Sequence, residues 1–160
     1  MISYRVGILT VSDRCFSGEN VDRSGPILLE RVHEFGFVVV ETAVVPDEIN
    51  AIQSKLTEWS NKCDLILTTG GTGLSSRDIT PTATRPLLTR ESSGISEFIR
   101  ARGYLNNPRA ALSCGIAGLI NRCLIVNLPG SLKGGSEGWE CLELLLPHAL
   151  DIASDSQADH

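Results

Sequence analysis

Short apolar runs alternate with segments of helical periodicity along the first half of the chain, and this alternation constrains the fold most strongly. The runs are residues 4–12, 37–45 and 65–69, and each is nearly continuous in apolar or β-branched side chains. Such runs are typical of strands that helices cover on both faces. The order strand, helix, strand, helix, strand predicts a parallel sheet with right-handed crossovers. We therefore expect an α/β fold, a three-layer α/β/α domain with a mostly parallel central sheet.

Local signals predict where the two intervening helices begin and end. Ser24 is expected to cap the first helix, with Pro26 in its first turn and Gly36 after its last turn. Asp47 stands where it can cap the second helix. Pro86 should break any long helix that follows the third strand.

The second half of the chain is less regular. Residues 95–104 have the pattern of a helix, and residues 105–123 support no assignment. Residues 123–131 form another apolar run that leads into a Pro-Gly turn, which predicts a buried strand and its loop. Residues 136–153 predict a final amphipathic helix with a kink near Pro147.

Length and composition are those of one ordinary globular domain. The 160 residues suffice for a single well-filled core, so residues 1–160 are expected to form one domain. The formal net charge of −5 argues against non-specific binding of nucleic acid, which needs a basic surface. No apolar stretch approaches the roughly 20 residues of a membrane span, and no secretory leader opens the sequence. We expect a cytoplasmic protein with neither a nucleic-acid nor a membrane partner.

Cysteine and histidine suggest no metal or nucleophile motif. The number of cysteines is odd and no pair has the C-x-x-C spacing, so we expect reduced thiols. The three histidines stand apart from one another and from any recognisable motif. Catalysis is therefore expected to depend on carboxylates, backbone amides or a bound metal ion.

Polar loops follow the carboxyl ends of the predicted strands. The first strand leads into Ser12 and Asp13, the second into residues 46–48, the third into residues 70–73, and the late strand into residues 127–131. The carboxyl ends of parallel strands lie at one edge of a sheet, and ligands bind there, at a topological switch point. We therefore expect these four loops to form one site.

The loop after the third strand has the sequence GGTG. Gly70, Gly71 and Gly73 lack Cβ atoms and can expose successive amides to an anion, while the Thr72 hydroxyl adds a donor. The alternative is that the glycines only make a turn. The loop matches neither the Walker A pattern nor G-x-G-x-x-G, which disfavours a P-loop ATPase and a dinucleotide-dependent dehydrogenase.

Two carboxylates accompany the glycine loop. Asp47 follows the second strand, and Asp78 follows the glycine loop, directly after Arg77. Two carboxylates beside a bound phosphate would repel it unless a cation lay between them, and Mg²⁺ is bound in this way by one or two carboxylates together with substrate phosphates. The alternatives are structural: Asp47 as a helix cap, and Asp78 as a cap or turn residue.

Six motifs in order resemble the molybdopterin adenylyltransferases of molybdenum cofactor biosynthesis, a family that includes the G domain of gephyrin. They are TVSD (10–13), DRSG (22–25), VPDE (45–48), LTTGGTG (67–73), RDITP (77–81) and NLPGS (127–131). The resemblance runs from about residue 4 to residue 153, which is the expected core of the domain.

The resemblance implies an enzyme that joins molybdopterin to AMP. The terminal phosphate of molybdopterin attacks the α-phosphate of Mg-ATP, and pyrophosphate leaves. Asp47 and Asp78 match the catalytic aspartates and are also the expected Mg²⁺ ligands. The expected substrate-binding residues are Ser12, Asp13, Gly70, Gly71, Thr72, Gly73, Ser113, Asn127, Pro129, Gly130 and Ser131. The family also implies a homotrimer and a molybdenum-insertion protein downstream.

The chain departs from the family pattern at two basic positions. Cys114 and Ile120 stand where the family usually has arginine. An anionic substrate that those arginines hold would be bound more weakly or in another way. Two alternatives to the transferase follow from the resemblance: a paralogue that binds molybdopterin without efficient transfer, and a trimeric scaffold module.

Overall fold

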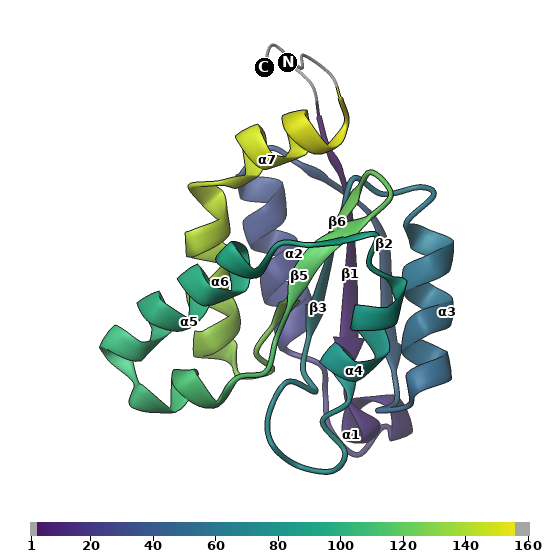
Figure 1. The fold of residues 1–160 in the computed structure, drawn as a ribbon. Coiled ribbons are helices and arrows are strands. Elements are labelled where there is room, and N and C mark those ends of the chain that lie inside the picture. Colours follow the sequence, from purple (N-terminus) through teal and green to yellow (C-terminus); the bar gives the residue numbers. More distant parts are fainter. Residues whose placement is uncertain (1–2, 156–160) are drawn as a thin grey trace.

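A six-stranded sheet forms the middle of three layers (Figure 1). The computed structural model describes residues 3–155. The order across the sheet is β2-β1-β3-β6-β5-β4, with β1, β2, β3 and β6 parallel to one another and β5 antiparallel to both of its neighbours. The strands are β1 (Arg5–Val11), β2 (Val38–Val45), β3 (Leu65–Thr69), β4 (Arg90–Glu91), β5 (Ala117–Ile120) and β6 (Cys123–Leu128). The predicted mostly parallel sheet is confirmed.

Helices cover both faces of this sheet. On one face α2 packs with α5, α6 and α7, and on the other face α3 packs with α4 (Figure 1). The helices are α1 (Asp13–Ser17), α2 (Ser24–Glu34), α3 (Ile49–Trp59), α4 (Thr80–Thr84), α5 (Ser93–Asn106), α6 (Leu132–Glu143) and α7 (Leu146–Ala153), with 3₁₀ turns at Arg85–Leu87 and Pro108–Leu112. Within residues 3–155 no helix has the length and apolar character needed to cross a membrane.

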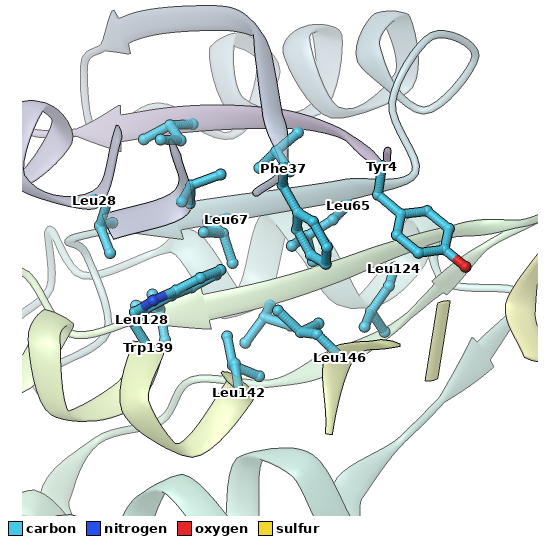
Figure 2. Packing of buried hydrophobic residues seen from close by; sticks show 14 of the residues in the cluster. Tyr4, Leu28, Phe37, Leu65, Leu67, Leu124, Leu128, Trp139, Leu142 and Leu146 are labelled. Atoms are coloured by element: carbon cyan, nitrogen blue, oxygen red, sulfur yellow. The ribbon is translucent and has the colours of Figure 1, made fainter. Parts of the chain in front are cut away.

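Each face of the sheet has its own apolar core. The core beneath α2, α6 and α7 contains Trp139, which packs among leucines of the sheet and of the helices (Figure 2). Phe35 lies edge-on to Trp139 at a centroid distance of 5.7 Å. The core beneath α3 and α4 contains Trp59, which is 1% exposed. β1, β3 and β6 are buried on both faces, which explains their continuous apolar sequences.

The topology creates a switch point between β1 and β3. The chain leaves β1 through α2 to reach β2 on one side, and α3 then carries it back across β1 to β3 on the other side. The two crossover helices lie on opposite faces of the sheet. The carboxyl ends of β1 and β3 therefore diverge toward different loops and leave a crevice between them.

The start of α2 differs from the prediction that Ser24 caps it. Ser24 is already the first residue of the helix, and its hydroxyl donates to the carbonyl oxygen of Gly130 at 2.9 Å. The carboxylate of Asp22 accepts the Gly25 N–H instead, at 3.1 Å. Gly36 follows the helix with a φ of +97°, as expected. The capping prediction was wrong because the Ser24 hydroxyl is used in a contact between loops far apart in sequence.

Two proline predictions are confirmed. α4 ends at Thr84, and the Pro86 region continues as a 3₁₀ turn. The predicted C-terminal helix is two helices, α6 and α7, with Pro147 in the first turn of α7. α6 also begins at Leu132, four residues earlier than the predicted 136.

The unassigned segment 105–123 contains a 3₁₀ turn and β5. β5 pairs with β6 through a two-residue hairpin turn in which Asn121 has a φ of +54°. Asparagine tolerates this left-handed conformation better than most residues do. Ile120 ends β5 and is 8% exposed in the core beneath α3, at the edge of the sheet opposite the carboxyl ends of the parallel strands.

Asn127 is a buried connector near the end of β6. Its Oδ1 accepts the N–H of Ile116 at 3.2 Å, and its Nδ2 donates to the hydroxyls of Thr68 and Thr84 at 3.0 and 3.3 Å. The residue is 4% exposed. These bonds tie β6 to β3, to α4 and to the segment before β5.

The glycines at the end of β3 make a turn that other residues cannot make. Gly70 and Gly71 have φ values of +101° and +70°. A Cβ on Gly70 would overlap the carbonyl oxygen of Val11, and one on Gly71 would overlap the Thr80 hydroxyl. Thr80 holds the turn from outside, since its hydroxyl donates to the Gly70 carbonyl at 2.9 Å. The turn interpretation of the two glycines is therefore correct.

The five cysteines are free thiols, as predicted. Cys63, Cys123 and Cys141 are buried, and burial raises the pKa of the Cys63 thiol to about 11. A thiol with a raised pKa is a poor nucleophile near neutral pH.

Asn127→Leu is expected to destabilise the fold by about 2 kcal/mol, because the buried Ile116 N–H loses its acceptor. Urea unfolding measures the change. Asn61→Ala, two residues after the end of α3, is the control. It removes one exposed hydrogen bond, to the Thr57 carbonyl, and should change stability by less than about 0.5 kcal/mol. An Asn127→Leu variant as stable as wild type would contradict the connecting role.

Gly71→Val is expected to destabilise the fold by about 2–5 kcal/mol, through left-handed backbone strain and overlap with Thr80. Gly94→Val is the matched control, because a Cβ at Gly94 meets no atom within 4 Å. Chemical denaturation of both variants checks the expectation. A Gly71→Val protein of wild-type stability would show that the turn tolerates side chains.

Candidate active site

A large cleft lies at the carboxyl ends of β1, β2, β3 and β6. Its volume is about 850 Å³, and we call it the main cleft. The predicted convergence of loops is observed, because the main cleft is lined by seven of the predicted site residues: Ser12, Asp47, Gly70, Gly71, Asp78, Gly130 and Ser131. Residues 19–23, from the loop before α2, and Ser24, the first residue of α2, form another part of its wall.

A smaller hollow of about 250 Å³ adjoins it, and we call it the side pocket. Thr72, Gly73, Ser113, Pro129 and Ser131 line this pocket, together with Arg109, Lys133 and Glu137. Ser131 lines both hollows. Most of the predicted site residues thus divide between two adjacent spaces, whereas Asp13 and Asn127 line neither of them.

Asp47 is held by Asp13 rather than by α3. Its Oδ2 accepts the backbone N–H of Asp13 at 2.9 Å, and its own N–H donates to Asp13 Oδ1 at 3.0 Å. α3 begins after Glu48, without a side-chain cap. The prediction that Asp47 caps this helix was wrong, because its carboxylate turns to the loop after β1.

The two carboxylates of this reciprocal pair differ in acidity. Burial raises the pKa of Asp47, and the negative charges of Asp13 and Asp78 add to the increase. The pKa of Asp13 is lowered by the hydrogen bond from the Asp47 backbone and by the Arg77 guanidinium. Asp47 and Asp78 both line the main cleft, so two negative charges share this space.

Asp78 closes the loop that follows the glycines. Its Oδ2 accepts the N–H of Ser75 at 3.0 Å, and its N–H donates to the Ser75 carbonyl oxygen at 3.0 Å. Gly73 leaves room for this carboxylate, since a Cβ there would lie 2.8 Å from Asp78 Oδ2. Asp78 is therefore a turn residue, and its Oδ1 has no hydrogen-bond partner within residues 3–155.

Several backbone donors around the two hollows are unused. In the described part of the chain no acceptor is bonded to the N–H groups of Gly71, Thr72 and Gly73. The N-terminal turn of α6 also faces the main cleft and the side pocket, with Ser131 as its cap. The glycines can therefore make a turn and also leave room for a phosphate. The positions where a Cβ would stand on Gly70 and Gly71 are filled by neighbouring protein atoms, while the N–H groups of residues 71–73 have no acceptor and could bind an anion.

The main cleft is acidic. Glu19, Asp22, Asp47 and Asp78 line it against one arginine, Arg23. The carboxylate of Asp22 is occupied, since it accepts hydrogen bonds from Thr10 and Gly25. Among residues 3–155 no group of three or more histidine, cysteine or acidic side chains is placed to hold a metal ion alone. A cation held by Asp47 and Asp78 would take its other ligands from water, backbone oxygens or a bound substrate.

Two sequence expectations change with this geometry. Asn127 uses its whole amide in buried bonds and faces the interior, so we remove it from the proposed substrate contacts. Ile120 lies at the opposite edge of the sheet, so the missing basic residue there does not affect this site. Cys114 does adjoin the side pocket, because it follows Ser113 and its N–H donates to the Thr72 carbonyl at 2.7 Å.

Asp22 is a site residue that sequence reasoning missed. It joins the end of β1, through Thr10, to the start of α2, through Gly25, and so shapes the wall of the main cleft. The DRSG motif was the only sequence signal for it.

Known proteins resemble this chain over nearly its whole length. The family described as "Probable molybdopterin binding domain" matches residues 7–150. The Molybdenum cofactor synthesis protein cinnamon of Drosophila melanogaster is 42% identical over 97% of this chain. This chain spans only 26% of that relative's length. The Molybdopterin adenylyltransferase of Helicobacter pylori strain J99 is 35% identical over 95% of this chain and 89% of its own length.

A solved structure agrees with both the fold and the sequence match. The crystal structure of the molybdopterin biosynthesis enzyme MoaB from Thermus thermophilus is 47% identical to this chain, with a TM-score of 0.91 over 96% of this chain and 98% of that one. The chain therefore belongs to the molybdopterin-binding domain family of molybdenum cofactor biosynthesis.

Proposed function

We propose that this protein transfers the adenylyl group of Mg-ATP to the terminal phosphate of molybdopterin. A phosphate oxygen of molybdopterin forms a bond to the α-phosphorus of ATP, the bond between the α-phosphorus and the bridging oxygen breaks, and pyrophosphate leaves. The observation that carries the proposal is the convergence of Asp47 and Asp78 on one cleft beside unused backbone amides. The printed name of the Helicobacter pylori relative supports the same reaction.

The two hollows suit two different substrates. The main cleft carries the two carboxylates, so we assign it to the triphosphate, which arrives with its metal ion. The side pocket carries Arg109 and Lys133, whose positive charges suit the phosphate of molybdopterin without a metal ion. Ser131 lies where the two spaces meet, which is where the reacting phosphates would approach each other.

Asp47 and Asp78 have the donor chemistry that Mg²⁺ requires. Both offer carboxylate oxygens, and the Oδ1 atoms remain after Oδ2 of each residue has accepted a backbone N–H. When bound there, Mg²⁺ would neutralise the phosphates of ATP. The protein supplies the alignment, through the amides of Gly71, Thr72 and Gly73 and the N-terminal turn of α6.

The direct test is to incubate the purified protein with molybdopterin, ATP and Mg²⁺ and to measure adenylylated molybdopterin and pyrophosphate. Equal amounts of the two products are expected. Pyrophosphate without the adenylylated pterin would contradict the proposal.

Cys114 favours one alternative, a paralogue that binds molybdopterin without efficient transfer. Cys114 directly follows Ser113, which lines the side pocket, and it stands where the family usually has arginine. Binding of molybdopterin with no adenylylated product would establish this alternative. A homotrimer, a scaffold role, a downstream molybdenum-insertion partner and a cytoplasmic location remain proposals from the resemblance alone.

Asp78→Asn is expected to reduce transfer at least about 100-fold, equivalent to about 2.7 kcal/mol in the barrier, while the protein stays folded. The amide can still accept the Ser75 N–H, so the loop keeps its bond and loses only the charge. Glu58→Gln, on α3 outside both hollows, is the control and should keep wild-type activity. Turnover of Asp78→Asn within a few-fold of wild type would remove the proposed catalytic role.

Asp47→Asn is expected to abolish transfer without weakening the fold. The amide can still accept the Asp13 N–H, and it replaces a carboxylate whose pKa is raised by burial. Because the folded-state pKa lies above the unfolded-state value, the ionised group opposes folding at higher pH, and this penalty disappears below the ordinary aspartate pKa of about 3.9.

Urea unfolding at two pH values checks this second expectation. Asp47→Asn should be as stable as wild type or more so near neutral pH, and the difference should shrink as the pH falls below about 4. A variant less stable than wild type by about 1 kcal/mol or more near neutral pH would contradict the view that the buried charge of Asp47 opposes folding.

A further inference from the structure

One exposed ion pair joins the loop after β1 to the loop after β3. The Arg77 guanidinium donates to both carboxylate oxygens of Asp13, from Nε to Oδ2 at 3.0 Å and from Nη2 to Oδ1 at 3.0 Å. Two parallel bonds of this kind fix direction as well as distance. The contact therefore sets the relative position of two loops that are far apart in the sequence.

Each partner of this ion pair stands next to one of the two proposed catalytic carboxylates. Asp13 exchanges hydrogen bonds with Asp47 in both directions, through its own N–H and through Oδ1. Arg77 directly precedes Asp78, whose backbone and side chain are both bonded to Ser75. Asp47, Asp13, Arg77 and Asp78 thus form an unbroken chain of contacts that links the two carboxylates lining the main cleft.

We propose that Arg77 is a positioning residue, which sets the gap between the Asp47 and Asp78 carboxylates by clamping Asp13. The proposal rests on the adenylyl transfer proposed above. Without the clamp, the loop at residues 73–78 is no longer tied to the β1 end of the cleft. Asp78 then moves relative to Asp47, and the two carboxylates no longer match one metal ion and its phosphates. Arg77 does not line either hollow.

Stability alone does not account for this pair. The side chains of Arg77 and Asp13 are 60% and 42% exposed, and ion pairs that are exposed to solvent contribute little to folding stability. By contrast, a displacement of about 1 Å in a catalytic site can reduce a rate about 100-fold. Loss of the clamp should therefore reduce activity far more than stability.

The chain offers a matched control. Arg5 donates to both oxygens of Asp64, from Nε and Nη2 at 3.2 Å each, and its side chain is 54% exposed. This pair joins the beginning of β1 to the residue before β3, at the edge of the sheet opposite the main cleft. Arg5→Met therefore removes a similar exposed pair where no catalytic carboxylate depends on it.

The experiment compares Arg77→Met, Arg77→Lys and Arg5→Met in the full chain. For each variant, kcat, the KM for molybdopterin, the Mg²⁺ concentration for half-maximal rate, the Tm, and the amide hydrogen exchange of Asp13 and Asp47 are measured. Both amides donate to the partner's carboxylate, so their exchange reports the clamped geometry directly.

Arg77→Met should lower kcat at least about 10-fold and raise the Mg²⁺ requirement several-fold, with the KM for molybdopterin nearly unchanged. Exchange of the Asp13 and Asp47 amides should accelerate. Arg77→Lys should be intermediate, because lysine cannot form two parallel bonds. Arg5→Met should change none of these quantities, and all three variants should have a Tm close to that of wild type.

Three results would overturn the clamp. The first is that the wild type is active and the kcat of Arg77→Met lies within about twofold of the wild-type kcat. Another is a large loss of kcat with unchanged amide exchange, which would mean that Arg77 contacts substrate instead. The third is an inactive wild type whose amide exchange is insensitive to Arg77→Met. An inactive wild type in which exchange still accelerates would refute the proposed transfer and retain the clamp as a structural device.

Discussion

The parallel pairing of β1 with both β2 and β3 is the constraint on which the rest of the molecule depends. It places the carboxyl ends of these strands, and of β6 beyond them, at one edge of the sheet. Because α2 and α3 cross on opposite faces, the loops diverge at β1 and β3 and leave the main cleft open. The glycine turn, Asp47 and Asp78 are brought together by topology, although they are separated in sequence.

The edge of the sheet is built from polar groups that bond to one another across loops. Ser24 reaches Gly130, Asp22 reaches Thr10, and Asp13 exchanges bonds with Asp47. In each case a residue of a type that is common in helix caps and turns forms a hydrogen bond to a residue much further along the sequence. This network orders the loops while it leaves the Oδ1 atoms of Asp47 and Asp78 available.

The sequence predicted what depends on local pattern. Residues 65–69 were predicted as a strand with the bounds that β3 has, and the four loops were predicted to share one edge. The sequence-based predictions were wrong where a contact between distant segments determines what a side chain binds. Ser24 and Asp47 are favourable capping residues, but their side chains form hydrogen bonds with residues far away in the sequence instead. β5 was missed because a short strand beside a two-residue hairpin has little periodic signal of its own.

The site also departs from what stability alone would favour. Burial raises the pKa of Asp47, so the ionised carboxylate is held in a position that disfavours its charge. Asp78 adds a second negative charge to the same cleft. Such an arrangement is typical of functional sites, where a ligand with the opposite charge offsets the cost. We propose that this ligand is a metal ion brought in with a triphosphate, because Mg²⁺ is bound by one or two carboxylates together with substrate phosphates.

We propose that Asp47 and Asp78 act together on one metal-bound triphosphate in the main cleft. A crystal structure of the protein with Mg²⁺ and a non-hydrolysable ATP analogue tests this directly. We expect one Mg²⁺ ion within about 2.1 Å of an oxygen from each carboxylate or bridged to it by water, with the α-phosphate near Ser131. A triphosphate bound in the side pocket, or a metal ion that contacts neither carboxylate directly or through water, would contradict it.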